Sequence, residues 1–199
     1  MAPYMMSVAL WVGCIAFSLM YPLTKYSGKL KSGLAWWGSK ASVLYLIALL
    51  QAAVMIFMLH LCDGFEPVAM GKTLAVACLA SVAFMSVMYF FTNTFGKVGS
   101  FLMLVFMVIQ LAGSVGTYPL ELSGSFVPYL HDWVPFTYTV EAFRSTISGG
   151  ESIQEAVIFL TVLWIVFTLL TILEFQIRTL KMKRGKRTLD NWLEEKGLA

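Results

Sequence analysis

The first side chains that could support chemistry are His60, Asp63 and Glu66, which lie within seven residues after an apolar run. Imidazole and carboxylate groups are common metal ligands. A single histidine with two acids beside a glycine-containing turn is nevertheless a weak metal pattern. We therefore expect these three side chains to lie in water rather than to bind a metal.

A second stretch, Gly71–Thr73, matches the end of a phosphate-binding loop. The first glycine of the complete motif, GxxxxGK[ST], would fall at Glu66, so the match is false and the chain has no ATP-binding motif. The sequence also lacks an HExxH motif and a recognisable set of nucleophile, base and orienting group. It predicts no enzymatic activity and no cofactor in this chain.

Ionisable groups at membrane depth are scarce in the sequence. The polar residues expected near the middle of the membrane are Gln51 and Gln110. Glu174 lies near one end of the last apolar run, where it can pair with Arg178 at i+4. A proton-coupled carrier is expected to keep ionisable groups near the midplane, so this pattern argues against a self-contained secondary transporter.

The elements that position these groups are membrane helices. The 199 residues are 59% hydrophobic and 13% charged, with a mean hydropathy of +0.78, whereas soluble domains carry about 25% charged residues. A helix needs about 20 apolar residues to cross the bilayer core and satisfies its own backbone hydrogen bonds. The fold class is therefore predicted to be all-α, a polytopic membrane helix bundle in one domain, residues 1–199. Its five transmembrane helices are predicted at about residues 4–22, 41–62, 73–96, 98–116 and 154–177.

Charge distribution predicts the orientation. Twelve of the 14 lysines and arginines fall in the first connection, the third connection and the tail, residues 178–199. By the positive-inside rule these segments are cytoplasmic, so the amino terminus lies outside a cell membrane and the carboxyl terminus inside. The basic residues also suit contact with anionic membrane lipids.

The first span begins almost at Met1 and has no charged segment or cleavage site of the kind found in signal peptides. We expect the chain to be the carboxyl-terminal membrane part of a longer protein. The alternative is a complete small protein with a short external amino terminus.

Small residues predict where helices approach closely. Ala9 and Gly13 form a small-xxx-small pair in the first span. The third span is rich in alanine, so one of its faces should pack tightly on a neighbour. Gly96 and Gly99 lie between the third and fourth spans, which should form an antiparallel hairpin.

The first cytoplasmic connection, residues 24–40, contains four lysines and two adjacent tryptophans. In one interpretation the lysines determine the topology and contact lipid headgroups, while the tryptophans anchor at the membrane interface. In the other, the segment is a docking surface for a soluble partner. The residues concerned are Lys25, Lys29, Lys31, Trp36 and Trp37.

The fourth span runs into glycines and a proline, which make a continuous straight helix unfavourable beyond Gln110. Two later pieces, Ser125–Asp132 and Phe136–Ser148, are predicted to be short helices because prolines and Gly149 mark their ends. Their aromatic residues favour a re-entrant or surface-lying helical hairpin over residues 117–149, on the outer side, rather than a free loop. Glu141 and Arg144 are expected to pair at i,i+3. The residues that define this region are Gly113, Gly116, Pro119, Glu121, Pro135, Tyr138, Glu141 and Arg144.

Two passages, Ala2–Gly13 and Leu111–Arg144, together with the five-span layout, resemble the carboxyl-terminal membrane region of the YhgE/Pip (phage infection protein) family. The most specific parts are Tyr118–Glu121 and Pro135–Arg144. That family is similar to the membrane subunits of ABC-2 type exporters. The resemblance implies an ABC-2-like bundle of six helices, of which this chain holds the last five.

The resemblance also implies roles for the two segments described above. Lys25–Lys40 would correspond to the cytoplasmic coupling region, where a separate nucleotide-binding ATPase subunit docks, so ATP would act only through that partner. Gly113–Gly149 would form the outer re-entrant gate. The implied function is a permease that works as a homodimer and exports an amphipathic or lipid-linked substrate. The alternative is a membrane scaffold for secretion, envelope assembly or phage adsorption that transports nothing, and neither function predicts a nucleic-acid partner.

Overall fold

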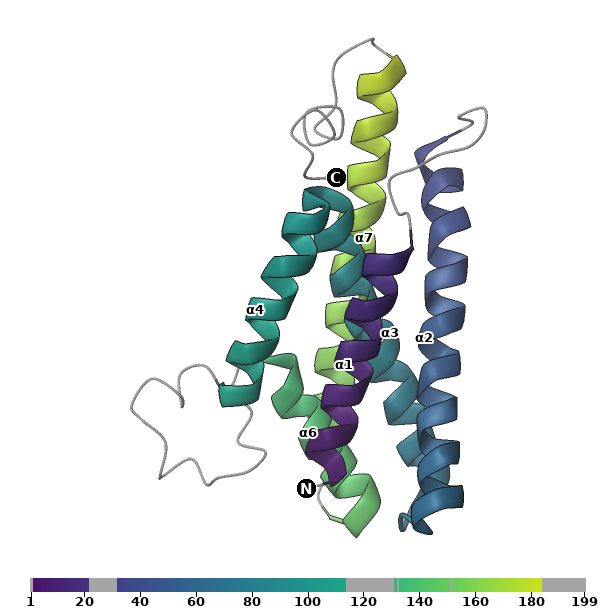
Figure 1. The fold of residues 1–199 in the computed structure, drawn as a ribbon, viewed down its shortest axis with the longest axis vertical. Helices are drawn as coiled ribbons and strands as arrows, with labels where there is room; N and C mark the ends of the chain where they lie inside the picture. The colour runs from purple at the N-terminus through teal and green to yellow at the C-terminus, as the bar shows by residue number, and fades with distance from the viewer. Residues whose placement is uncertain (1, 22–31, 114–130, 132, 151, 184–199) are drawn as a thin grey trace.

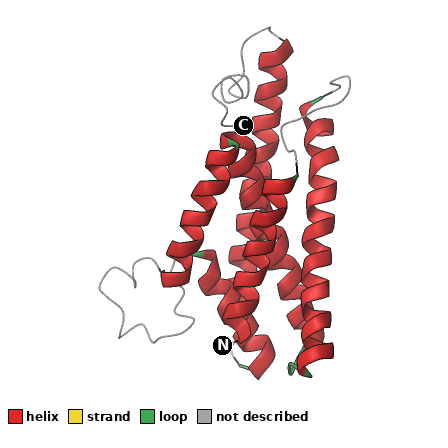
Figure 2. Ribbon diagram, viewed as in Figure 1, coloured by secondary structure: helices red, strands yellow, loops and turns green. Residues whose placement is uncertain are grey.

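In a computed structural model the chain forms a bundle of α-helices (Figure 1). The structure describes residues 2–21, 32–113, 131, 133–150 and 152–183. Within these ranges Figure 2 shows helices and no strands, which confirms the predicted all-α class. The helices are α1 (Ala2–Met20), α2 (Gly33–Asp63), α3 (Met70–Phe95), α4 (Lys97–Gly113), α6 (Pro135–Ser148) and α7 (Gln154–Lys183).

The bundle is built from apolar helices of membrane length. Four of the described helices, α1, α2, α3 and α7, are long and apolar enough to cross a bilayer. The shorter α4 is apolar over Lys97–Leu111. Figure 1 shows that α4 runs back from the end of α3 to the end of the bundle where α6 lies. The protein is therefore membrane-embedded, and the count of five spans stays a prediction.

The central helix is α3, which packs against α1, α2, α4, α6 and α7. Three of its alanines, Ala77, Ala80 and Ala83, have no exposed surface. Such small side chains let helix backbones approach closely within a membrane. This confirms the prediction that one face of the third span packs tightly.

Helices α3 and α4 form the predicted hairpin. Gly96 adopts a φ of 59° between them, a backbone conformation that favours glycine. A Cβ atom added to Gly99 would lie 2.0 Å from the carbonyl oxygen of Phe91, so only glycine allows α4 to start so close to α3.

A half-buried amide joins three helices of the bundle. Gln51 of α2 donates hydrogen bonds from Nε2 to Ser81 Oγ of α3 at 2.7 Å and to Cys14 Sγ of α1 at 3.1 Å. Ser81 in turn donates to the carbonyl oxygen of Ala48 at 2.6 Å. Gly13 admits this amide, because a Cβ atom there would lie 2.3 Å from Gln51 Oε1. Gly13 of the predicted small pair therefore lies at a close helix contact, whereas Ala9 is exposed.

Two helices extend beyond the predicted spans. The second span was predicted from residue 41, but α2 begins at Gly33, where the Ser32 hydroxyl accepts a hydrogen bond from the Ala35 amide and caps the helix. The last span was predicted to end at residue 177, but α7 continues to Lys183. Charges limit the length of a membrane span, not of the helix that contains it, which explains both differences.

Candidate functional site

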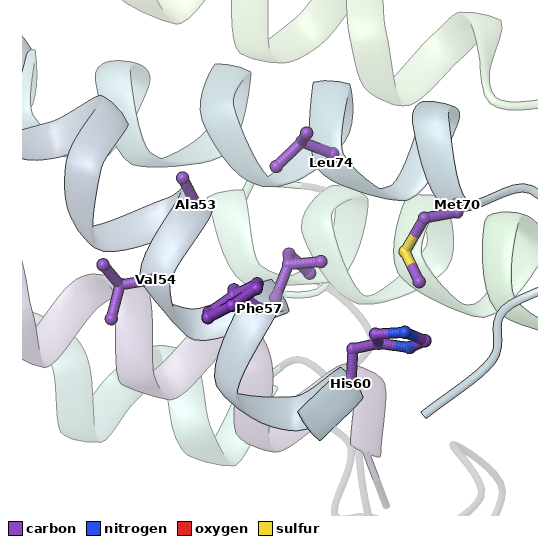
Figure 3. Close-up of a pocket in the computed structure, with 7 residues that line it drawn as sticks. Ala53, Val54, Phe57, His60, Met70 and Leu74 are labelled. Atoms are coloured by element: carbon purple, nitrogen blue, oxygen red, sulfur yellow. The ribbon is translucent and has the colours of Figure 1, made fainter. Parts of the chain in front are cut away.

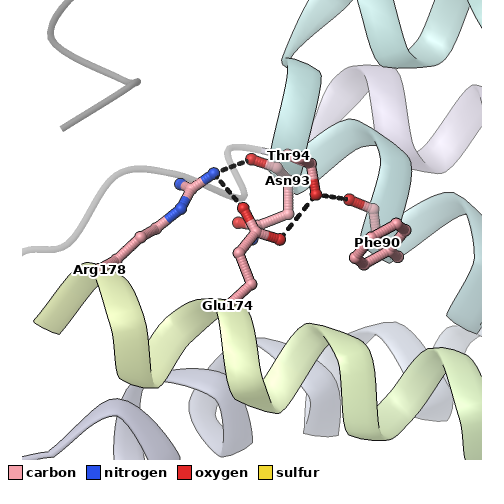
Figure 4. Close-up of polar contacts among 5 residues, drawn as sticks. All are labelled: Phe90, Asn93, Thr94, Glu174 and Arg178. Atoms are coloured by element: carbon pink, nitrogen blue, oxygen red, sulfur yellow. Dashed lines mark hydrogen bonds and ion pairs between the residues drawn. The ribbon is translucent and has the colours of Figure 1, made fainter.

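The strongest candidate site is a charged cluster where α7 lies against the end of α3 (Figure 4). Arg178 Nη2 lies 2.5 Å from Glu174 Oε1, one turn earlier on α7. The same nitrogen donates a hydrogen bond to the carbonyl oxygen of Asn93 on α3. Thr94 Oγ1 lies 2.7 Å from Glu174 Oε2. The predicted pairing of Glu174 with Arg178 is thus confirmed, and it also joins two helices.

Both charges of the pair are largely shielded from solvent. The side chain of Arg178 is 7% exposed and that of Glu174 is 17% exposed. Moving two charges out of water carries a large desolvation cost, also near the end of the predicted span, where this pair lies. Pairing and hydrogen bonding offset part of this cost, and they tie α7 to α3 at this end of the bundle.

Two members of the cluster, Asn93 and Thr94, are absent from the residues selected by sequence. Thr94 Oγ1 lies 2.7 Å from both Glu174 Oε2 and the carbonyl oxygen of Phe90, and its single hydrogen can be donated to one of them at a time. The Asn93 side chain has no exposed surface, and its amide nitrogen and oxygen have no hydrogen-bond partner among the described residues. The sequence feature that could have indicated them is the polar run Thr92–Thr94 near the end of an apolar span.

The first turns of α2 pack beside this cluster. The Trp36 ring meets the Phe175 ring edge-on, with centroids 4.8 Å apart. Gly33 lies so close to α7 that an added Cβ atom would be 2.8 Å from the carbonyl oxygen of Phe175. The residues predicted for coupling therefore divide: Trp36 and Trp37 belong to α2, and Lys25, Lys29 and Lys31 lie outside the described residues.

Burial changes the interpretation of Trp36. Its side chain is 4% exposed, so it supports the packing of α2 on α7 and does not present a surface to a partner. Trp37 is half-buried. Any docking surface in this region must be formed by residues other than Trp36.

At the opposite end of the bundle, α6 confirms the second predicted short helix. Pro135 occupies its first turn, and Gly149 ends it with a φ of 71°. The Tyr138 ring stacks on Phe159 of α7, with centroids 3.9 Å apart and planes 13° apart. Phe136 packs edge-on against Trp11 of α1 at 5.6 Å.

The predicted ion pair on α6 is wrong. Glu141 Oε1 lies 4.0 Å from His131 Nε2, an ion pair only when the histidine is protonated, and no ion pair joins Glu141 to Arg144 among the described residues. Both Glu141 and Arg144 are exposed. The attraction between two charges in water is too weak to offset the entropy lost when two long side chains are held in one geometry.

Several residues of the predicted re-entrant gate are not placed. Gly113 is the last residue of α4. Gly116, Pro119 and Glu121, together with most of the predicted helix Ser125–Asp132, lie outside the described residues. The hairpin therefore stays a prediction, while its second helix, α6, is established.

Comparison with known proteins gives one informative relative. Over 151 residues, which are 76% of the chain, the sequence is 33% identical to a Bacillus subtilis (strain 168) protein named "Uncharacterized protein YhgE". The matched region spans 20% of the length of that relative. No family model and no solved structure matches the chain. The identity and the bundle of apolar helices together lead to one conclusion: the chain is a membrane protein related to the YhgE family.

Proposed function

We propose that this chain is the membrane permease component of an ABC-2-like exporter that works with a separate ATPase. The observation that carries the proposal is the buried Glu174–Arg178 pair, which joins α7 to the end of α3 beside the first turns of α2. A buried charged pair that ties two helices together at the end of the predicted span supports a mechanical link between them, which anchoring alone does not need.

The packing of α7 supports a mechanical link between the two ends of the bundle. Phe159 stacks on α6, and Phe175 packs against Trp36 of α2. At a rise of about 1.5 Å per residue, the 16 residues between these contacts span about 24 Å, most of the bilayer core. A displacement of the start of α2 can therefore be carried by one rigid helix to the short helix α6.

In this proposal the ATPase binds the cytoplasmic end at the lysine-rich segment before α2. The chain contributes no catalytic residue and no nucleotide site of its own. Two copies form the translocation path, and α6 closes its outer end. The substrate is amphipathic or lipid-linked, since the bundle offers apolar surfaces and few intramembrane charges to a hydrophilic solute.

The test uses the full-length protein reconstituted into vesicles with a candidate nucleotide-binding subunit from the same organism. ATP turnover by that subunit should rise several-fold when the membrane protein is present. Photo-crosslinkers at positions 29 and 31 should capture the subunit, while a crosslinker at position 144, an exposed position of α6, should not. If ATP turnover is unchanged and the subunit is not crosslinked at positions 29 and 31, the permease proposal is contradicted.

The second proposal is a membrane scaffold that transports nothing. It is favoured by the length comparison, because four fifths of the YhgE relative lies outside the matched region and would be the part that such a scaffold anchors. If the full-length protein binds secretion or envelope components and does not change ATP turnover, the scaffold function is supported over the permease function.

A further inference from the structure

An apolar groove opens between α2 and α3, near the end of α2 and the start of α3 (Figure 3). Its volume of about 540 Å³ lies within the range of small-molecule sites, about 300–1,000 Å³. The groove belongs to neither the charged cluster nor the α6 contacts. Its walls include Ala53, Val54, Phe57, His60, Met70 and Leu74.

The helical register aligns these walls along the membrane direction. Ala53, Phe57 and His60 follow each other at intervals of four and three residues, so they share one face of α2. Met70 and Leu74 are one turn apart on α3. The stripe on α2 is about 10 Å long at 1.5 Å per residue, about a third of the bilayer core. The groove is thus elongated along the helices, in the direction of lipid acyl chains.

The surroundings of the groove identify its occupant. Both helices are long and apolar enough to cross a membrane, and the groove lies within those segments. Val54 and Phe57 are 48% and 56% exposed, whereas Ile56 is buried at 5% and also lines the groove. At this depth an apolar hollow meets hydrocarbon rather than water, and an unfilled hollow loses packing contacts. The small side chain of Ala53 leaves room for a hydrocarbon chain.

His60 adds a polar group at one end of the groove. Its Nδ1 lies 3.0 Å from the carbonyl oxygen of Phe65. A carbonyl oxygen only accepts, so Nδ1 carries the hydrogen, and Nε2 of the neutral ring is an acceptor. A lipid headgroup that contacts Nε2 must therefore offer an N–H or O–H donor.

We propose that the groove binds one acyl chain of a membrane phospholipid whose headgroup donates a hydrogen bond to His60 Nε2. Phosphatidylethanolamine has a suitable ammonium donor, whereas phosphatidylcholine has none. The two lipids carry the same net charge, so net charge cannot explain a difference in their binding, and the loss of that difference in His60→Phe separates the hydrogen bond from the effect of headgroup size. This site does not depend on the proposed transport function.

The test uses the purified chain in vesicles that contain phosphatidylethanolamine with a photoactivatable acyl chain. Adducts should be several-fold more frequent on the peptides that carry residues 53–60 and 70–74 than on the exposed face of α7 around Leu169 and Leu173. Equal labelling of both faces would show an ordinary lipid-facing surface and overturn the proposal. This mapping needs no variant, so it is independent of any folding defect.

Two substitutions separate the chain site from the headgroup contact. Ala53→Trp should fill the groove and reduce its labelling to the level of α7, while Leu169→Trp, at an exposed position of α7, should leave it unchanged. His60→Phe should keep the labelling but abolish the preference for phosphatidylethanolamine over phosphatidylcholine. Labelling that resists Ala53→Trp in a correctly inserted protein, or no preference in the unchanged chain, contradicts the proposal.

A second copy of the chain is the competing occupant. Cys62 is exposed at the end of α2, one turn or less from His60. If another copy covers the groove, a thiol-reactive crosslinker should join Cys62 residues of two chains and exclude the lipid label. Efficient Cys62 crosslinking with an unlabelled groove would therefore overturn the lipid assignment.

Discussion

Replacing Glu174 with leucine removes the negative partner of a buried arginine. Arg178 is 7% exposed and Glu174 17%, so solvent can screen little of their interaction. Removing one partner of a buried ion pair costs about 3–5 kcal/mol, because the remaining charge is left uncompensated. We expect Glu174→Leu and Arg178→Met each to lower the free energy of unfolding by about that amount.

The double variant distinguishes charge pairing from simple loss of side-chain volume. With both charges absent, no buried charge is left unpaired, and apolar replacements of such pairs are often neutral or stabilising. Thr94 still has the carbonyl oxygen of Phe90 at 2.7 Å as an acceptor. The double variant should therefore lose far less stability than the sum of the two single variants.

Unfolding in mixed micelles of increasing sodium dodecyl sulfate content, followed by circular dichroism, measures these differences. Glu155→Gln is the matched control, because Glu155 is an exposed carboxylate on the same helix. It should change stability by less than about 1 kcal/mol, because Glu155 is an exposed acid in the first turn of the helix. Single-variant losses below about 1 kcal/mol, the value typical of exposed pairs, would refute the assignment of a buried structural ion pair.

The remaining predictions concern packing elsewhere in the bundle and use the same unfolding measurement. Gly99→Ala should destabilise the α3–α4 hairpin by about 1–3 kcal/mol, because its Cβ atom meets the Phe91 backbone. Gly71→Ala, whose Cβ atom meets nothing within 4 Å, should be neutral or stabilising. Equal effects of the two substitutions would contradict the close approach of α4 to α3. Gln51→Leu should lower the free energy of unfolding by about 0.6–1.7 kcal/mol, the range measured for hydrogen bonds between membrane helices. The loss should be smaller when Ser81 is already replaced by alanine. An equal loss in both backgrounds would contradict the hydrogen bond between Gln51 and Ser81. A double-mutant cycle of Tyr138→Leu and Phe159→Leu should give a coupling of about 0.5–1.5 kcal/mol, and additivity would mean that the rings do not interact.

Local patterns in the sequence were sufficient for some elements. Pro135 and Gly149 have conformational preferences that act within a few residues, and they mark the start and the end of α6 as predicted. Glu174 and Arg178 are one turn apart on a single helix, so their pairing follows from helix geometry alone. Such short-range relations can be inferred without knowledge of the tertiary fold.

Contacts between distant segments could not be inferred in the same way. Asn93 and Thr94 join the charged cluster only because α3 packs on α7, and they are 80 or more residues from their partners. The Trp36 contact with Phe175 likewise depends on how α2 lies against α7. The Glu141–Arg144 prediction failed because correct helical spacing permits a pair but does not require one at exposed positions.

The most direct test of the proposed function is ATP turnover in vesicles that hold the full-length protein and a candidate nucleotide-binding subunit. The permease function predicts several-fold stimulation by the unchanged membrane protein. It also predicts that Glu174→Leu reduces this stimulation while Glu155→Gln preserves it, provided that both variants insert equally. Equal stimulation by all three proteins would contradict the role assigned to the charged cluster, and no stimulation by the unchanged protein would contradict the permease function itself.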